Sequence, residues 1–471
     1  MVGIKACGAY IPLYSLGRDL VAKAWDFPSV PGSKALANND EDSITMAVEA
    51  GGDCLNKIEP KTVDGLYFAT TTAPYAEKQG SALIAAALDM RKDIQTIDFT
   101  DSLRAGTTAL IAACNAIQSG AAKSILVVAA DCRIAEPESM FEFQYGDGAA
   151  AVLLAKDDVG ATIDGFNSVS DEFTGPWRRE KDTYTREFEV KHDALYGYAN
   201  QVGAVLMALA QKYKVDPKAI AKLVMYSPDP RAPAEIAKRM GVEAAKVQDS
   251  MFFAIGNTGT PLALMMLAAA LEQAQPNQKM VVVGVGDGAD ALLLTTTDKV
   301  AQTKGKRGIT GHVFSMKPVK NYNEYLRNKQ LLERERFSRR TSTVIYYRDK
   351  NKILNLHGMK CKNCGTIQYP IQRVCVECGA KDNWEEVRMP KTGKVFTYTL
   401  DHLGGGEYLV TPVPRIVINL DGGGKIFLEM TDCDPKEVKI DMPVELTFRW
   451  LHESAYFKHY YWKCRPIRGG N

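Results

Sequence analysis

Four cysteines near residue 370 have the spacing of a metal site. Cys361 and Cys364 form one CxxC pair, and ten residues separate it from a second pair, Cys375 and Cys378. Each pair can place two thiolates on one tetrahedral metal, and the glycine that follows each pair suits the knuckle turn. Four thiolates fill the coordination sphere. The spacing therefore predicts one structural Zn²⁺ with no open position for catalysis.

The remaining composition is that of an ordinary globular protein with no sign of secretion. Hydrophobic residues make up 46% of the 471 residues, and the net charge is +2, which gives no indication of a nucleic-acid partner. No apolar run of about 18 residues and no signal-peptide pattern is present. We therefore expect a cytoplasmic protein that neither spans nor binds a membrane. The six other cysteines are scattered, as in a reducing compartment: Cys7, Cys54, Cys114, Cys132, Cys433 and Cys464.

Residues 1 to 300 alternate strand-like and helix-like patterns. The runs 65–70, 124–130, 223–226 and 280–285 are short and apolar, which favours strands buried on both faces, and 78–88 and 200–213 are helix-like. The stretch from Asp98 to Ile117 is the most informative. It predicts a strand end, a sharp turn and a buried helix that opens at Arg104-Ala105-Gly106-Thr107.

A repeat indicates that this α/β part is duplicated. GDGAAAVLL at 146–154 returns as GDGADALLL at 286–294. An apolar strand precedes each copy, and a helix led by Gly-Thr precedes each strand. Two such units packed together predict a layered fold with a ligand site between the halves.

These features together resemble the thiolase superfamily. The motifs are YGDGAAAVLL, the helix-opening AGTTAL after a strand, and IGNTGTP at 255–261. Within the superfamily, the pattern is similar to the hydroxymethylglutaryl-CoA synthase and ketoacyl synthase III branch. The resemblance implies a duplicated α/β/α/β/α fold, an acyl-CoA substrate that carries coenzyme A, and three catalytic groups: a cysteine, a histidine and a glutamate.

None of those three catalytic groups is present at its expected position. The cysteine position falls on Leu103, the histidine position on Tyr226 and the glutamate position on Thr71. Residues 1 to 300 contain a single histidine, His192, and it precedes the second-half strand. The oxyanion asparagine of the family is present as Asn257.

The resemblance therefore implies carbon–carbon bond chemistry without an acyl-enzyme. A leucine cannot attack a thioester, whereas aldol and retro-aldol steps need only an acid or base and enolate stabilisation. We expect Asn257 to orient the thioester or enolate oxygen. Tyr226 can move the proton if its pKa is lowered or if the substrate alkoxide is itself basic. Tyr226 fits a packed aromatic at a strand end equally well.

Two alternatives remain open from the sequence. A register slip of one residue offers Ser102 as an unusual nucleophile for acyl transfer. Otherwise the chain is a non-catalytic, thiolase-like subunit that pairs with a cysteine-bearing partner. The resemblance implies a homodimer or heteromer formed through this domain in either case.

The rest of the chain reads as a connector and two small domains. Residues 301–345 form a basic connector with a predicted helix from Asn321 to Arg339, whose arginines are candidates for a clamp on coenzyme A phosphates or for a solvated surface. The zinc ribbon occupies 346–385. Five short strands over 386–471 favour an OB-type barrel. Ribbon and barrel together resemble the acyl-CoA-associated zinc-ribbon/OB domain, here fused to a thiolase-like domain at 1–300 with halves of about 1–160 and 161–300.

Overall fold

The chain folds into two compact units. The computed structural model describes residues 1–469 apart from 174, 180, 333–341, 404–409 and 455. Unit 1 comprises residues 1–37 and 42–325, and unit 2 comprises residues 38–41 and 326–469. The following description takes each unit by itself.

Unit 1 contains two copies of one α/β pattern. The first half consists of β1 (Gly3–Tyr10), α2 (Ser43–Cys54), β4 (Gly65–Ala69), α3 (Gly80–Ala87), β5 (Gln95–Phe99), α4 (Ala105–Gln118), β6 (Ser124–Asp131), α5 (Met140–Gln144) and β7 (Gly148–Ala155). The second half consists of β8 (Ala161–Ser170), α7 (Ala199–Tyr213), β9 (Ile220–Met225), α8 (Ala232–Arg239), α9 (Phe252–Ile255), α10 (Leu262–Glu272), β10 (Lys279–Val285) and β11 (Gly288–Thr296).

The strand pairing confirms the duplication that the glycine motif predicted. The large sheet runs β5-β4-β6-β7-β1-β8-β11-β10-β9. In each half the strand that follows the GDG turn, β7 or β11, is antiparallel to both of its neighbours. Val247 pairs with Leu223 in parallel beyond β9, as a single-residue counterpart of β5. The two halves meet through a short antiparallel contact between β1 and β8.

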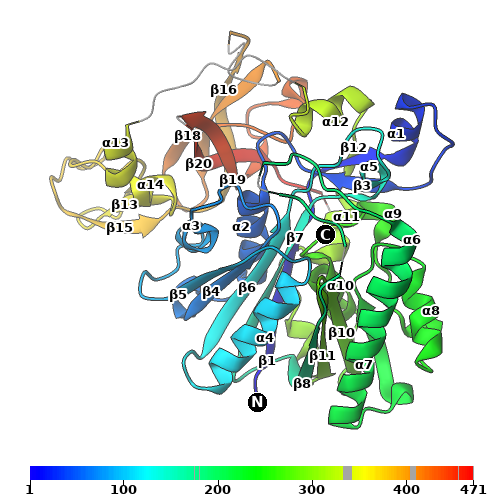
Figure 1. Cartoon of the computed structure of the whole chain (residues 1–471). Coiled ribbons are helices and arrows are strands. Elements are labelled where there is room, and N and C mark those ends of the chain that lie inside the picture. Colours follow the sequence, from blue (N-terminus) through cyan, green and yellow to red (C-terminus); the bar gives the residue numbers. More distant parts are fainter. Residues whose placement is uncertain (174, 180, 333–341, 404–409, 455, 470–471) are drawn as a thin grey trace. The chain divides into compact units, whose positions relative to one another are not determined.

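Helices α4 and α10 form the middle layer of a five-layer α/β/α/β/α arrangement. Helix α4 packs on β4 and β6 of the first half and also on β10 and β11 of the second (Figure 1). Helix α10 likewise contacts strands of both halves, and ten of its eleven residues are buried. Its sequence, LALMMLAAALE, is apolar on every face, as a helix enclosed between two sheets requires. Helices α2 and α7 cover the outer faces of the two halves.

Smaller elements complete unit 1. Strands β2 (Tyr14–Gly17), β3 (Ser33–Leu36) and β12 (Lys317–Pro318) form a separate sheet in the order β12-β2-β3. Helix α11 (Gly308–Phe314) packs on β1 and α10, so residues beyond 300 still belong to this unit. Helix α12 (Tyr322–Asn328) begins in unit 1 and ends in unit 2, and it is much shorter than the predicted 321–339 helix. The chain turns out of it at Gln330, whose φ of 55° is left-handed, and residues 333–341 lie outside the described residues.

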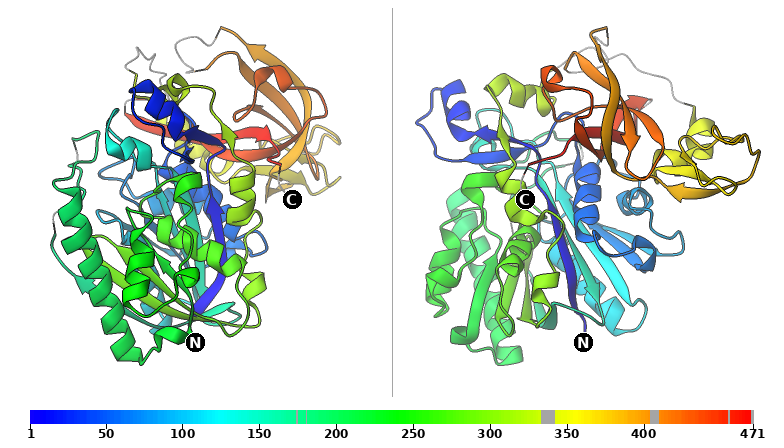
Figure 2. Two further views of the ribbon diagram at one scale, coloured as in Figure 1. Left: turned by 90° about the vertical axis from the view of Figure 1, so that its right-hand side faces the viewer. Right: turned by 180° about the vertical axis from the view of Figure 1, so that it is seen from behind.

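Unit 2 contains a ribbon and a barrel. After α13 (Thr343–Arg348) and α14 (Lys350–Ile353), the ribbon is a sheet in the order β14-β13-β15, built from β13 (His357–Cys361), β14 (Ile367–Gln368) and β15 (Trp384–Arg388). The barrel strands follow the order β18-β17-β16-β19-β20: β16 (Thr392–Asp401), β17 (Val413–Leu420), β18 (Lys425–Glu429), β19 (Pro443–Ser454) and β20 (Phe457–Pro466). A parallel bridge between Met430 and Cys464 closes the barrel, whose curled strands Figure 2 shows in orange and red. The predicted OB-type barrel is confirmed.

Candidate active site and zinc ribbon

Three residues singled out by the sequence lie just beyond the carboxyl ends of parallel strands in unit 1. Strands β4, β5 and β6 are parallel to one another, and β9 and β10 form a second parallel pair. Thr71 follows β4, Leu103 follows β5 through a short turn, and Tyr226 follows β9. Ligand sites of open α/β sheets occur at such carboxyl ends.

Tyr226 and Asn257 contact each other directly. The Asn257 amide nitrogen donates to the Tyr226 hydroxyl at 3.2 Å, and the Gly259 N–H donates to the amide oxygen at 2.9 Å, which fixes the orientation of the amide. Both side chains are buried. Because the phenol oxygen is the acceptor, its own proton stays available for donation.

The surroundings keep Tyr226 protonated. Burial raises the pKa of its phenol, and the charge of Asp131 adds to the rise, while the Arg133 charge and the hydrogen bond from Asn257 oppose it. A phenol with a raised pKa is neutral at physiological pH. The first of the two predicted conditions, a lowered pKa, is therefore wrong, and Tyr226 is suited to donate a proton to a basic substrate oxygen.

A second tyrosine and an arginine adjoin this pair. The guanidinium of Arg133 donates to the Tyr145 hydroxyl at 2.7 Å and stacks on its ring, with Cζ 3.7 Å from the ring centroid. Burial raises the pKa of Tyr145 to about 12, although the Arg133 charge opposes the rise. We call Arg133, Tyr145, Tyr226 and Asn257 the tyrosine cluster.

Two buried carboxylates hold loops in place in unit 1, and the first of them lies near Tyr226. Asp131, at the end of β6, accepts hydrogen bonds from the backbone or hydroxyls of Thr70, Thr71, Thr72 and Thr260. Thr71 occupies the position where the resemblance predicts a glutamate, and its hydroxyl donates to Asp131. The Thr260 hydroxyl is buried and has no partner among the described residues, so one polar atom at this edge remains unused.

The second carboxylate, Asp290, supports the start of α4. It accepts hydrogen bonds from Thr107 at 3.0 Å, Thr108 at 2.7 Å and Ser168 at 2.7 Å, and it pairs with Arg104 at 3.5 Å.

The turn before α4 holds no activated nucleophile. The Leu103 side chain is partly buried and packs against the core. Ser102 donates its hydroxyl to the Gly286 carbonyl at 3.0 Å, so its proton points to an amide oxygen and not to a base. The two histidines of unit 1 are engaged elsewhere: His192 stacks on Phe173, and His312 packs on Tyr10. Cys114 is buried within α4 as core packing.

Sequence reasoning missed Asp131, Arg133 and Asp290, whereas Tyr145 was one of several tyrosines that could face the site. A signal was present for all three missed residues. Asp131 and Arg133 directly follow an apolar strand buried on both faces, at the edge where sites form. Asp290 places a carboxylate in a buried strand where the first copy of the repeat has Ala150. The arginines of the predicted phosphate clamp, Arg334, Arg336, Arg339 and Arg340, lie outside the described residues.

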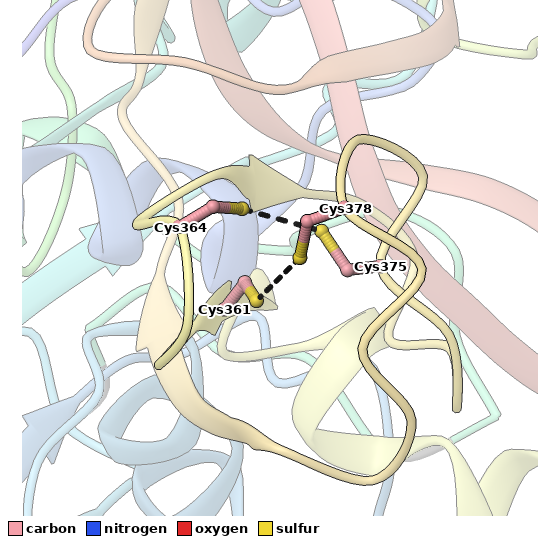
Figure 3. Close-up of side chains that lie close together, drawn as sticks. All are labelled: Cys361, Cys364, Cys375 and Cys378. Carbon is pink, nitrogen blue, oxygen red and sulfur yellow. Dashed lines mark hydrogen bonds between the residues drawn. The ribbon is translucent and has the colours of Figure 1, made fainter.

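The four ribbon cysteines converge as their spacing predicts. The sulfur–sulfur distances are 3.7 Å for Cys361–Cys378 and 3.6 Å for Cys364–Cys375, and all four sulfurs lie within 4.8 Å of one another (Figure 3). A tetrahedron with Zn–S bonds of about 2.3 Å has sulfur–sulfur edges of about 3.8 Å. Gly365 and Gly379, one residue beyond each pair, adopt φ of 77° and 69°, a conformation that favours glycine. The donor set fits a closed Zn²⁺ site.

Three family models match parts of the chain. Residues 97–172 match the model for 3-oxoacyl-[acyl-carrier-protein] synthase III. Residues 355–385 match the rubredoxin-like zinc ribbon domain of ChsH2, and residues 386–449 match its C-terminal OB-fold domain. None of the described helices is long and apolar enough to cross a bilayer.

Relatives that match over nearly their whole length cover a larger share of the chain. The hydroxymethylglutaryl-CoA synthase of Pyrobaculum arsenaticum is 29% identical over 346 residues, which cover 70% of this chain and 99% of that enzyme. The corresponding synthase of Methanopyrus kandleri is 26% identical over 344 residues, covering 70% of this chain and 98% of that enzyme.

Solved structures show the same fold at lower identity. A structure of HMG-CoA synthase complexed with CoA superposes with a TM-score of 0.63 at 16% identity, covering 72% of this chain and 95% of that one. The synthase III of Pseudomonas aeruginosa gives a TM-score of 0.57 at 20% identity, covering 63% of this chain and 98% of that one. The chain thus joins a thiolase-like domain, similar to hydroxymethylglutaryl-CoA synthases and to 3-oxoacyl-[acyl-carrier-protein] synthase III, to a ChsH2-type zinc ribbon and OB-fold domain.

Proposed function

We propose that the chain is an enzyme that makes or breaks a carbon–carbon bond on an acyl-CoA by an aldol-type step, without an acyl-enzyme. The contact between Tyr226 and Asn257 carries this proposal. A retained oxyanion asparagine beside a neutral phenol supports acid catalysis at an oxygen, whereas Leu103 supplies no nucleophile. The relatives, which match over nearly their whole length, are named hydroxymethylglutaryl-CoA synthases, and this supports an acyl-CoA as substrate.

In the condensing direction each group has one task. The Asn257 amide N–H stabilises the thioester oxygen as it becomes an enolate oxygen. The enolate carbon then attacks the carbonyl carbon of a second substrate, and Tyr226 gives its proton to the carbonyl oxygen, which becomes a hydroxyl. The unpartnered Thr260 hydroxyl is a further donor at this edge. Cleavage follows the same steps in reverse.

Replacing Tyr226 by Phe tests the acid role. The substitution removes only the hydroxyl, so we expect turnover to fall by about 100-fold or more. Binding of CoA, measured by calorimetry, should stay within about twofold. Tyr198→Phe is the matched control, because Tyr198 is a buried neighbour that donates its hydroxyl to the Tyr226 carbonyl oxygen. Unchanged turnover in Tyr226→Phe refutes the role.

The two alternatives predict different observations. An acyltransferase that uses Ser102 requires a stable acyl adduct on that residue after incubation with acyl-CoA, detectable by mass spectrometry. The hydrogen bond from Ser102 to the Gly286 carbonyl does not favour this role. A non-catalytic subunit requires a cysteine-bearing thiolase-type partner that copurifies with the chain. We propose that the thiolase-like domain forms the dimer or heteromer interface in either case.

We propose further that the ribbon holds one structural Zn²⁺ per chain. Hydrogen bonds from Asn363 and from the Ala380 N–H lower the pKa of Cys378 to about 6, so this ligand is a thiolate at neutral pH. Replacing Cys364 by Ser should remove the metal, measured by elemental analysis, and expose β13–β15 to hydrogen exchange. Cys433→Ser, outside the cluster, should keep the metal. Purified protein without stoichiometric zinc contradicts the proposal.

A further inference from the structure

The segment of residues 171–193 is attached to two sides of the tyrosine cluster. Arg178 donates to the Thr71 carbonyl at 3.0 Å, beside the position where the relatives' glutamate is expected. Arg186 pairs with Glu136 at 2.5 Å. The Thr185 side chain lies close to the Tyr145 hydroxyl and opposes the rise of its pKa. The described part of this segment therefore lies over the cluster from β4 to α5.

Backbone geometry directs Glu187 toward the same cluster. Trp177 and Arg186 exchange both backbone hydrogen bonds, at 2.9 and 2.8 Å, so the chain is extended here. Side chains alternate sides in an extended chain, which places Thr185 and Glu187 on one side and Arg186 on the other. Burial agrees with this: Thr185 is buried, Arg186 is exposed and Glu187 is half-buried. Thr185 contacts Tyr145, so the Glu187 carboxylate faces the cluster as well.

A second carboxylate keeps Glu187 basic. Both carboxylate oxygens of Asp193 are shielded from solvent and accept no hydrogen bond from the described residues. Burial, followed by the nearby Asp193 charge, raises the pKa of Glu187. Burial and the charge of Glu189 also raise the pKa of Asp193, against the effect of His192. A carboxylate whose pKa is raised toward neutrality is a stronger base than an ordinary one.

The other carboxylates of the site are unsuited to this task. Asp131 accepts five hydrogen bonds, and Asp290 accepts three and pairs with Arg104. Their oxygens are already engaged with the hydroxyl, backbone and guanidinium donors that hold the neighbouring loops and the start of α4. Among the acidic residues near the cluster, Glu187 combines orientation toward the site with an environment that favours proton uptake.

We infer that Glu187 is the base that takes the α-proton of the acyl-CoA, in place of a glutamate at position 71. This inference rests on the proposed aldol-type function. The α-carbon–hydrogen bond breaks, its proton moves to a Glu187 oxygen, and the electron pair forms the enolate held by Asn257. The enolate forms the new carbon–carbon bond, and Tyr226 protonates the resulting alkoxide. Transfer of the proton from Glu187 back to Tyr226 through solvent restores both groups, so no oxidant or further reactant is consumed.

Hydrogen exchange at the α-carbon isolates this step from bond formation. Wild-type protein is incubated in D₂O with acetyl-, propionyl- or butyryl-CoA and no second substrate, and deuterium uptake is followed by mass spectrometry. We expect uptake with wild type and a loss of about 100-fold or more in Glu187→Gln. Glu235→Gln, an exposed residue of α8, is the control and should exchange like wild type. Glu187→Asp keeps a carboxylate and should exchange at an intermediate rate.

The pH profile gives a readout that a structural role of Glu187 would not change. Exchange needs ionised Glu187, so its rate falls as pH drops through the Glu187 pKa. Removing the Asp193 charge with Asp193→Asn lowers that pKa, so the acidic limb should move to lower pH.

Two results overturn the inference: exchange in folded Glu187→Gln within about twofold of wild type, or no exchange by wild type with any of the three thioesters. Calorimetry with CoA distinguishes the causes of the second result. If wild-type protein binds CoA but catalyses no exchange, only the assignment of Glu187 as the base fails. If it binds no CoA, the proposed function fails as well. Exchange without condensation supports Glu187 as the base but contradicts the proposed formation of a carbon–carbon bond.

Discussion

At the scale of single residues, Asp290 shows how the two copies of the repeat have diverged. Its counterpart in the first copy is Ala150, and both lie in strands that are buried on both faces. A carboxylate is stable there because Thr107 and Thr108 from α4 and Ser168 from β8 donate to it, and Arg104 supplies the opposite charge. Asp290 thereby ties the first turn of α4, beside Leu103, to β11.

Neutralising Asp290 should destabilise this turn. Asp290→Asn keeps the size of the side chain but removes the buried charge that pairs with Arg104, so we expect unit 1 to lose about 2–3 kcal/mol of stability. Asp287→Asn in the same motif is the control. That residue is exposed, and its φ of 50° suits Asn, so its cost should stay below about 0.5 kcal/mol. Urea denaturation followed by a unit 1 tryptophan such as Trp25 measures both. Equal costs contradict the assigned role of Asp290.

The site was predictable from the sequence only where a residue occupies a motif position. Tyr226 and Asn257 were located by their distance from a strand and a glycine turn, and the structure places them in contact. Arg133 follows an apolar strand in the same way, but Glu187 carries no such marker. The orientation of Glu187 is set by the backbone pairing of Trp177 with Arg186, and this pairing depends on how an irregular segment folds back. The pKa of Tyr226 was also beyond reach, because its direction depends on burial and on charges from other elements.

At the scale of elements, close packing explains the second GDG turn. A Cβ on Gly286 would lie 2.7 Å from the Ser102 Oγ, 2.9 Å from the Leu103 nitrogen and 3.0 Å from the Arg104 nitrogen. The turn after β10 therefore touches the backbone of the turn before α4, and the absence of a side chain permits this contact. The repeated motif thus positions the helix start as well as forming a strand.

Adding a methyl group at Gly286 should displace that helix start. Two of the three clashes are with backbone atoms, which cannot rotate away, so Gly286→Ala should cost about 1–3 kcal/mol. Turnover should fall with it. Gly203→Ala is the control. Gly203 lies within α7, and a methyl group added there would meet no atom within 4 Å, so alanine should stabilise by about 0.5–1 kcal/mol. Thermal unfolding of both variants checks the difference in sign.

Periodicity predicted the regular elements well and failed where a helix had to stop. The apolar runs became β4, β6, β9 and β10, and the segment 200–213 became α7. The segment after residue 321 is rich in helix-forming residues, yet α12 ends at Asn328 because the chain turns left-handed at Gln330. Neither a proline nor a glycine marks that end, so the sequence shows no stop signal.

At the scale of the whole molecule, four residues of the N-terminal part of the chain belong to unit 2. Residues 38–41 lie between β3 and α2 in sequence, but their buried carboxylates complete a charge network of unit 2. Asp40 pairs with Arg449 at 3.3 Å and with Lys463 at 3.0 Å, and Glu41 pairs with Arg449 at 2.6 Å. The Arg449 side chain is 0% exposed, so it depends on these partners. Unit 2 is therefore incomplete as a continuous C-terminal fragment.

Asp40→Asn should loosen β19 and β20 in a way that depends on pH. Burial alone would raise the pKa of Asp40, but the charges of Lys463 and Arg449 prevail and hold it below its usual range. The stabilisation is therefore fully present above about pH 4, the ordinary range of an aspartate, and is lost as pH falls through the lowered pKa. At pH 7 we expect a loss of about 3 kcal/mol, seen as faster hydrogen exchange in β19 and β20.

The difference between wild type and Asp40→Asn should shrink toward acid pH, because protonation removes the same charge from the wild type. Glu437→Gln, an exposed residue of unit 2, should change exchange by less than about 0.5 kcal/mol at any pH. A pH-independent difference would mean that Asp40 acts through its shape and not its charge. The four-residue segment would then fill space in unit 2, and the ion pairs with Glu41 and Asp432 would balance the buried charge of Arg449.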